Sequence, residues 1–127
     1  MKVLGVNWVG LRSDDFAACR GFFSEVMGMN VSLERQDFAV FQLPDGGKLA
    51  IFGPQGPASP AQFQDAPVVA GFWVEDIEAA RRELVAGGAE LLGGVGGDPT
   101  GYRWQHFRTP EGRVFEISCD PGRPIPS

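Results

Sequence analysis

The chain repeats itself, and this internal repeat constrains the fold more than any other feature of the sequence. LPDGGKLAIF at residues 43–52 aligns without a gap with TPEGRVFEIS at residues 109–118. Earlier in the chain, VGLRSDDFAACRGFF at residues 9–23 resembles AGFWVEDIEAARREL at residues 70–84. In both members of this second pair, an apolar stretch leads to an aspartate and a segment with helical spacing follows. A duplicated sequence predicts two similar structural units that pack on each other.

Each unit is predicted to contain one strand, one helix and then three strands. The stretches 3–11 and 68–74 are apolar and rich in β-branched residues, which is typical of strands. An aspartate follows each stretch, and its carboxylate can accept backbone N–H bonds at the start of a helix. The predicted elements are strand 3–11, a helix from Asp14 or Asp15 to Gly28, strands 30–35, 38–43 and 48–53, strand 68–74, helix 76–87, and strands 89–92, 102–108 and 113–119.

The two modules are expected to occupy about residues 1–58 and 66–120 of a single domain, since 127 residues is an ordinary domain length. The proline-rich stretch GPQGPASPAQFQDAP is expected to join them. Residues 121–127, PGRPIPS, contain three prolines and are predicted to form a loose tail. A flexible loop is predicted where five glycines gather without a phosphate-binding GxGxxG motif, at Gly93, Gly94, Gly96, Gly97 and Gly101.

Charge and composition argue against several classes of partner. The formal net charge is −5 and no basic stripe is present, so nucleic acid and anionic membranes are not expected partners. No apolar run reaches the ~18 residues of a membrane span. Cys19 and Cys119 have neither CxxC nor zinc-site spacing, which suits reduced thiols. We therefore expect a cytoplasmic protein whose partner is a small molecule, with neutral or cationic ligands favoured by the acidic chain.

Strand alternation predicts which side chains face a common pocket, because successive residues point to opposite faces of a sheet. In the last hairpin, pairing Phe107 with Phe115 on the core face would place His106 opposite Glu116 on the other face. The same rule, applied to the strands at 3–11 and 68–74, leaves the aliphatic faces for the core. The predicted pocket face carries Trp8, Arg12, Trp73, Trp104, His106, Arg108 and Glu116.

The duplicated unit and its ending, P-[DE]-G-x-[VL]-[FY]-E-[IL] within WQHFRTPEGRVFEI (104–117), resemble the vicinal oxygen chelate superfamily. This group includes glyoxalase I, the extradiol dioxygenases, and the fosfomycin- and bleomycin-resistance proteins. The resemblance extends over nearly the whole chain. It implies an α+β fold in which two tandem βαβββ modules form a cup-shaped mixed sheet around a pocket, with the helices on the outside. It also implies a homodimer.

The resemblance further implies where a metal would bind. Metal-dependent members carry ligands on the first and last strands of each module, and the matching residues here are Trp8, Ala50, Val69 and Glu116. Only Glu116 can ligate a divalent ion, and His106 would raise the count to two. Catalytic zinc sites and the iron facial triad each need three protein ligands. We therefore expect no bound metal and no cofactor.

Two roles remain open for each polar candidate. Glu116 could act as a general base or anchor a cationic ligand group, since burial and neighbours tune the basicity of a carboxylate. Alternatively, it is the remnant of a metal site and pairs with His106 or an arginine. His106 could contact a ligand, transfer protons, or make a structural hydrogen bond. Arg12 and Arg108 could hold a carboxylate or phosphate, or form surface salt bridges.

The tryptophans Trp8, Trp73 and Trp104 could stack on a ligand or belong to the core. Two functions follow from the whole pattern. The favoured one is a metal-free small-molecule-binding protein resembling the bleomycin-resistance proteins, with its ligand in an aromatic pocket. The alternative is a metal-independent lyase or isomerase in which Glu116 is the general base, with His106 or an arginine stabilising an enolate-like charge. A module that only binds other proteins is disfavoured by the polar groups in the predicted pocket.

Overall fold

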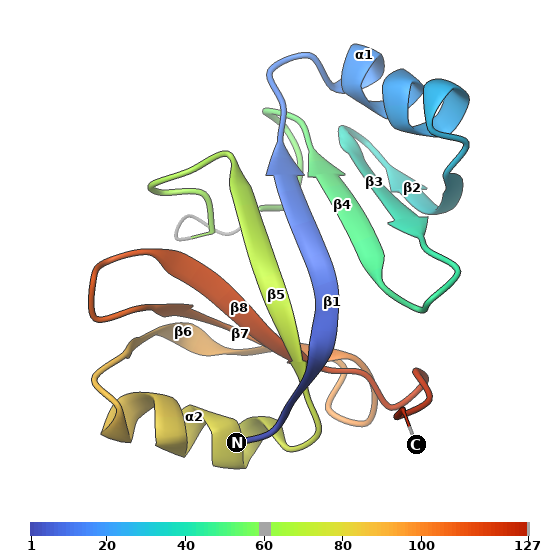
Figure 1. Cartoon of the computed structure of the whole chain (residues 1–127). Helices are drawn as coiled ribbons and strands as arrows, with labels where there is room; N and C mark the ends of the chain where they lie inside the picture. Colours follow the sequence, from blue (N-terminus) through green and yellow to red (C-terminus); the bar gives the residue numbers. More distant parts are fainter. Residues whose placement is uncertain (59–61, 127) are drawn as a thin grey trace.

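The computed structural model describes residues 1–58 and 62–126, and its eight strands form one mixed sheet (Figure 1). Part of the predicted connection between the modules, residues 59–61, lies outside this description. The elements are, in chain order, β1 (Val3–Arg12), α1 (Phe16–Gly21), the π-helix η1 (Phe22–Val26), β2 (Asn30–Arg35), β3 (Phe38–Gln42), β4 (Lys48–Phe52), β5 (Val68–Val74), α2 (Ile77–Ala86), β6 (Glu90–Gly97), β7 (Arg103–Arg108) and β8 (Val114–Cys119).

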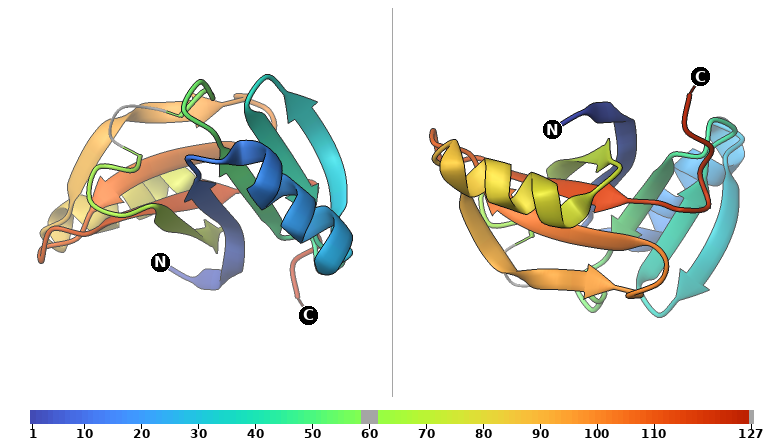
Figure 2. Two further views of the ribbon diagram at one scale, coloured as in Figure 1. Left: turned by 90° about the horizontal axis from the view of Figure 1, so that it is seen from above. Right: turned by 90° about the horizontal axis from the view of Figure 1, so that it is seen from below.

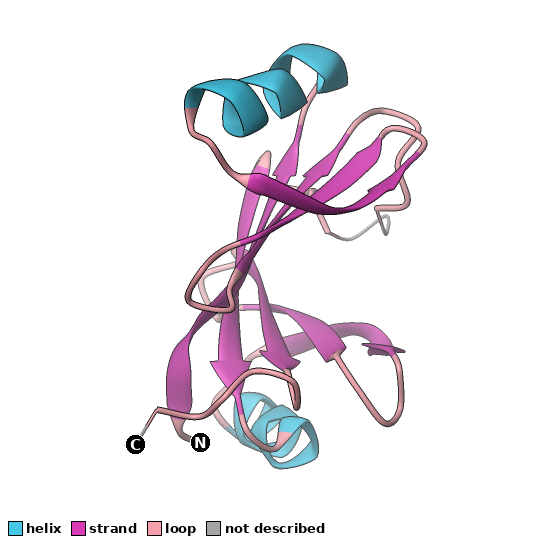
Figure 3. Ribbon diagram, turned by 90° about the vertical axis from the view of Figure 1, so that its right-hand side faces the viewer, coloured by secondary structure: helices cyan, strands magenta, loops and turns pink. Residues whose placement is uncertain are grey.

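The strand order across the sheet is β2-β3-β4-β1-β5-β8-β7-β6, so the two βαβββ units meet at its centre. There, β1 and β5 pair antiparallel, whereas β1 with β4 and β5 with β8 are parallel pairs. The α+β fold expected from the sequence is confirmed. α1 and α2 lie at opposite ends of the molecule, each beside the strands of its own unit (Figure 2, Figure 3).

Each helix begins where the aspartate pattern predicts. Asp15 caps α1 by accepting a hydrogen bond from the backbone N–H of Ala18 at 3.2 Å. Asp76 caps α2 through the N–H of Ala79 at 3.0 Å. α2 packs into a core between helix and sheet through Ile77. The part of the chain that the structure describes contains no helix long and apolar enough to cross a membrane.

The predicted glycine loop is partly wrong, because β6 continues to Gly97. Its pairing with β7 shifts register between Leu92 and Gly96, and Gly96 then faces Trp104. A Cβ atom on Gly96 would lie only 2.6 Å from Cε2 of Trp104. The missing side chain therefore allows the indole to lie directly against the neighbouring strand. Of the five glycines, only Gly101 lies in the loop between β6 and β7, because the other four belong to β6.

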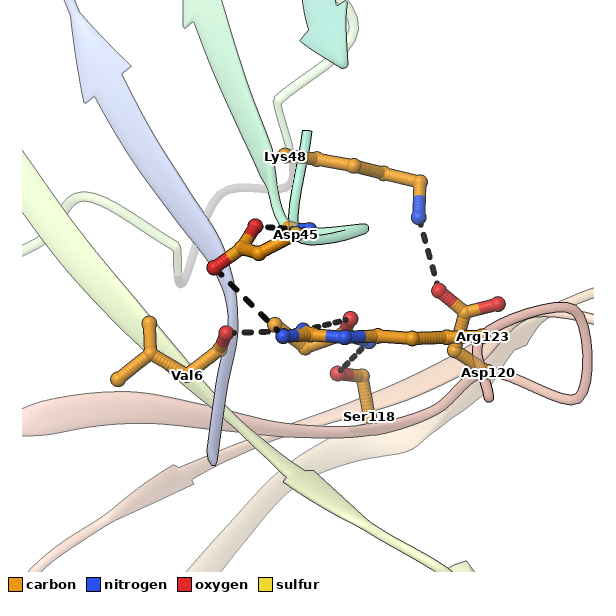
Figure 4. A network of polar contacts seen from close by, with 8 residues as sticks. Val6, Asp45, Lys48, Ser118, Asp120 and Arg123 are labelled. Carbon is orange, nitrogen blue, oxygen red and sulfur yellow. Dashed lines mark hydrogen bonds and ion pairs between the residues drawn. The ribbon is translucent and has the colours of Figure 1, made fainter. Parts of the chain in front are cut away.

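The tail after β8 is not loose around Arg123, which corrects the expectation for residues 121–127. Nη1 of Arg123 donates hydrogen bonds to the carbonyl of Val6 and to Oδ1 of Asn7, both at 3.0 Å (Figure 4). The guanidinium carbon also lies 4.2 Å from the centre of the Trp73 ring. These contacts fasten the C-terminal segment to the central strands. Ser127 lies outside the described residues.

Candidate functional site

One cavity of about 520 Å³ is lined by residues from both modules. The first module contributes side chains from β1, β2, β3 and β4, and the second contributes side chains from β7 and β8. Most of the wall is apolar. It includes the aromatic side chains of Trp8, Phe38, Phe52 and Trp104 and the aliphatic side chains of Val40 and Ala50. The polar side chains that line the cavity are Lys48, Gln62, Tyr102, His106 and Glu116.

His106 and Glu116 lie side by side in this wall. The hairpin of β7 and β8 pairs Phe107 with Phe115 and His106 with Glu116, which confirms the predicted register. Nε2 of His106 is 3.1 Å from Oε2 of Glu116. His106 is 6% exposed and Glu116 only 3% exposed, so both polar groups are removed from bulk water.

Two buried polar atoms of the lining lack a hydrogen-bond partner among the described residues. They are Nε2 of His106 and the hydroxyl of Tyr102. Nε2 of His106 nevertheless lies within ion-pair distance of the Glu116 carboxylate, and the Tyr102 hydroxyl lies near Ser118. Buried polar groups are nearly always fully hydrogen-bonded, so the incomplete hydrogen bonding of these two groups in a single cavity needs an explanation. A ligand that supplies the missing partners would satisfy both.

Burial changes the ionisation of two lining residues. Removal from water raises the pKa of Glu116, and the hydrogen-bonding capacity and charge of the neighbouring His106 oppose this rise only in part. Burial also raises the pKa of Tyr102, and the negative charge of Glu116 adds to the effect. The Tyr102 phenol therefore stays neutral and keeps its proton as a hydrogen-bond donor.

The raised pKa of Glu116 makes the stability of the protein depend on pH. The folded state holds the Glu116 proton more tightly than the unfolded chain, where the pKa is about 4.5. Between that value and the raised folded value, the folded state binds more protons, so stability falls as pH rises. Glutamine cannot ionise and avoids this loss.

We therefore expect Glu116→Gln to gain stability relative to the native chain as the pH rises from about 4.5 to about 8. The gain amounts to about 1.36 kcal/mol for each unit by which the pKa is raised. Urea unfolding of both proteins at the two pH values measures it. A stability difference that stays constant with pH would contradict the burial effect. Glu111→Gln, an exposed change in the turn before β8, is the control and should show no such trend.

The structure brings together four of the seven predicted site residues. Trp8, Trp104, His106 and Glu116 all line the cavity. The other three lie outside its lining. Trp73 is buried beneath Arg123, Arg12 lines a separate cavity of about 160 Å³, and Arg108 donates hydrogen bonds to Gln64 and Glu90. The expectation that three tryptophans line one pocket is therefore corrected for Trp73.

The predicted pocket face includes residues that lie outside the cavity, because one face of the sheet extends beyond the cavity. Trp73 points to the same face as Glu116, but the C-terminal segment covers it. Conversely, sequence reasoning missed Lys48 and Tyr102. Alternation along the chain could have found Tyr102, since it precedes Trp104 and His106 at two-residue steps. Lys48 likewise alternates with Ala50 on β4.

The side chains at the implied metal positions do not fit a metal. Trp8, Ala50 and Val69 belong to one buried apolar cluster. They have no donor atoms suited to a divalent ion, and Glu116 is the one carboxylate among the four positions. Within residues 1–58 and 62–126, no group of three His, Cys, Asp or Glu side chains is arranged to hold a metal ion.

Comparison with known structures shows the same fold. A glyoxalase/bleomycin resistance protein/dioxygenase superfamily member from Vibrio splendidus 12B01 is 23% identical, with a TM-score of 0.63 over 91% of this chain and 97% of that one. Methylmalonyl-CoA epimerase from Mycobacterium tuberculosis is 18% identical, with a TM-score of 0.68 over 93% and 89%. The Mn(II)-bound glyoxalase from Novosphingobium aromaticivorans is 20% identical, with a TM-score of 0.74 over 99% of this chain and 42% of that one.

A search of curated proteins found no match to the sequence. The model of one protein family, however, matches residues 5–117, which is most of the chain and includes both modules. The match agrees with the architecture of the sheet and with the structural neighbours. The chain belongs to the Glyoxalase/Bleomycin resistance protein/Dioxygenase superfamily.

Proposed function

We propose that this protein binds a small, mainly apolar molecule in the cavity between its two modules. One observation carries the proposal, namely a mostly apolar, aromatic cavity whose lining holds a few buried polar groups, among them the side chains of His106 and Glu116 and the hydroxyl of Tyr102. Ligand sites in proteins are mostly apolar hollows with a few polar groups that fix orientation. The cavity of about 520 Å³ lies within the range of such sites, and its aromatic wall suits a flat ligand.

A metal is not needed for this function. The side chains of Trp8, Ala50 and Val69 form an apolar cluster beside Glu116. Ligand binding would therefore depend on shape complementarity, aromatic stacking and hydrogen bonds. The resemblance to bleomycin-resistance proteins supports a role in holding a ligand without changing it. The same cavity chemistry allows a cytoplasmic metabolite or a foreign compound as the natural ligand.

Filling the cavity is expected to abolish binding. Ala50 is buried in the cavity wall, and Ala50→Leu adds three carbon atoms to the space that a ligand would occupy. We expect biphenyl-4-carboxamide, a flat neutral probe, to quench tryptophan fluorescence with saturation in the native protein. Its affinity should fall about tenfold or more in Ala50→Leu, because ligand and side chain would compete for one volume.

Ala17→Leu is the matched control, since Ala17 is exposed on α1 and does not line the cavity. It should leave probe affinity unchanged. Circular dichroism and urea unfolding check that both variants fold. Absence of saturable quenching in the native protein, or equal affinity in both variants, would contradict binding in this cavity.

A metal-independent lyase or isomerase is the second candidate, and a specific observation favours it. Burial raises the pKa of Glu116, which moves a carboxylate toward the range where a general base works best. His106 at 3.1 Å could stabilise the charge that forms on the substrate. Such an enzyme would show turnover that falls as Glu116 becomes protonated and that is lost in Glu116→Gln. Binding alone requires no turnover.

A further inference from the structure

One end of the cavity is rich in hydrogen-bond donors. Among the described residues that line the cavity, Lys48 is the one lysine or arginine. Its ammonium lies 2.9 Å from Oδ2 of Asp120 and 4.8 Å from the centre of the Tyr102 ring. The Tyr102 hydroxyl is buried there near Ser118, and its own proton lacks a hydrogen-bond acceptor. The ammonium has three N–H groups, and the bond to Asp120 uses one of them.

This donor-rich end matches an acceptor with negative charge. A carboxylate has two oxygen atoms that accept hydrogen bonds, and bonds between charged partners are about twice as strong as neutral ones. A single carboxylate could accept from the Tyr102 hydroxyl and the Lys48 ammonium together. The neutral state of the phenol, which its raised pKa preserves, keeps that donor available.

We propose that Lys48 and Tyr102 form a carboxylate-binding subsite, so that the protein prefers flat, mainly apolar carboxylic acids over neutral molecules of the same shape. This inference rests on the proposed small-molecule binding and adds the chemical class of the ligand. It reverses, for this cavity, the preference for neutral or cationic ligands that the acidic composition of the chain suggests.

The positions of the other polar groups orient such a ligand. Tyr102, Trp104 and His106 are spaced two residues apart and all line the cavity, so they extend over about 13 Å of extended chain. The acid group would bind at the Lys48 end, and the apolar body would lie along Trp104. Glu116 lies beside His106, and its negative charge also reaches the Tyr102 hydroxyl, so the Lys48 ammonium must supply the attraction for the acid group.

Asp120 would compete with the ligand for the Lys48 ammonium. Its carboxylate neutralises the lysine in the free protein, and its side chain is largely buried. Removing the lysine charge and removing the aspartate charge both break the same ion pair. The two changes should nevertheless shift ligand affinity in opposite directions. Loss of the lysine charge removes the attraction for the ligand carboxylate, whereas loss of the aspartate charge removes its competitor.

The experiment compares biphenyl-4-carboxylate with biphenyl-4-carboxamide, which share one shape and differ in charge. Fluorescence titration of the native protein should show tighter binding of the carboxylate. Lys48→Met should weaken carboxylate binding about tenfold and carboxamide binding clearly less, because the amide has no charge for the ammonium to attract. Tyr102→Phe should weaken the carboxylate about threefold or more. Asp120→Asn should strengthen it. Lys2→Met, at an exposed lysine, is the control and should change neither probe.

The outcomes separate the two proposals. If neither probe binds the native protein, small-molecule binding in this cavity is wrong and the subsite is wrong with it. If both bind equally, or the carboxamide binds better, only the carboxylate subsite is wrong. If Lys48→Met and Asp120→Asn weaken the carboxylate alike, the ion pair is structural and the subsite is again wrong. The opposite changes in these two variants would establish it.

Discussion

Arg123→Ala is expected to lower the free energy of unfolding by about 2–4 kcal/mol, the sum of two lost hydrogen bonds and a lost contact with an aromatic ring. The Arg123 side chain is 10% exposed. Its loss would leave Oδ1 of Asn7 without this donor inside a buried region and uncover the ring of Trp73. Urea unfolding followed by circular dichroism measures the change.

Arg113→Ala is the matched control for Arg123. The Arg113 side chain is 65% exposed, and its ion pair with Asp65 spans 3.9 Å. Exposed pairs of this kind contribute little, so we expect a loss below about 0.5 kcal/mol. A similar loss in both variants would mean that the C-terminal segment is not held by the contacts of Arg123. Arg123→Lys adds a second check, since it keeps the charge but loses the flat group that stacks on Trp73.

Gly10→Ala is expected to destabilise the protein by about 1–3 kcal/mol and to weaken ligand binding as well. The indole of Trp8 lies across Gly10, and a Cβ atom there would come 2.0 Å from its Cη2 atom. The indole must then move, and it forms part of the cavity wall. Stability by urea unfolding and affinity for biphenyl-4-carboxamide should therefore fall together.

Gly5→Ala is a control on the same strand. A Cβ atom on Gly5 would have its nearest neighbour, in Trp73, at 3.8 Å, which is ordinary contact. We expect a change in stability below about 0.5 kcal/mol and no change in probe affinity. If Gly10→Ala and Gly5→Ala change stability and probe affinity equally little, the Trp8 indole can adopt another position at little cost in free energy. The cavity wall would then be more deformable than the contacts indicate.

Membership in the superfamily does not by itself assign an activity, because one fold supports many chemistries through its site residues. The site of this protein departs from a metal centre at Trp8, Ala50 and Val69, which form an apolar cluster. The site instead contains a buried acid next to a histidine, together with a lysine and a tyrosine. The homodimer and the cytoplasmic location stay predictions.

The sequence by itself determined the features that depend on neighbouring residues. The repeat predicted two similar modules. The aspartates after each first strand, Asp14 or Asp15 and Asp76, predicted both helix starts. Alternation along β7 and β8, with one assumed aromatic pair, predicted that His106 lies opposite Glu116. These inferences worked because hydrogen bonding within a helix and pairing within a hairpin are set over short stretches of chain.

Only the tertiary structure decided which residues share the cavity. Lys48 and Tyr102 lie 54 positions apart in the chain, and their contact depends on how the two modules and the C-terminal segment pack. Trp73 has the right alternation but is covered by Arg123. Gly96 belongs to a strand, and its missing side chain leaves room for Trp104. Alternation fixes the face of a sheet on which a side chain lies, whereas burial depends on distant segments that cover that face.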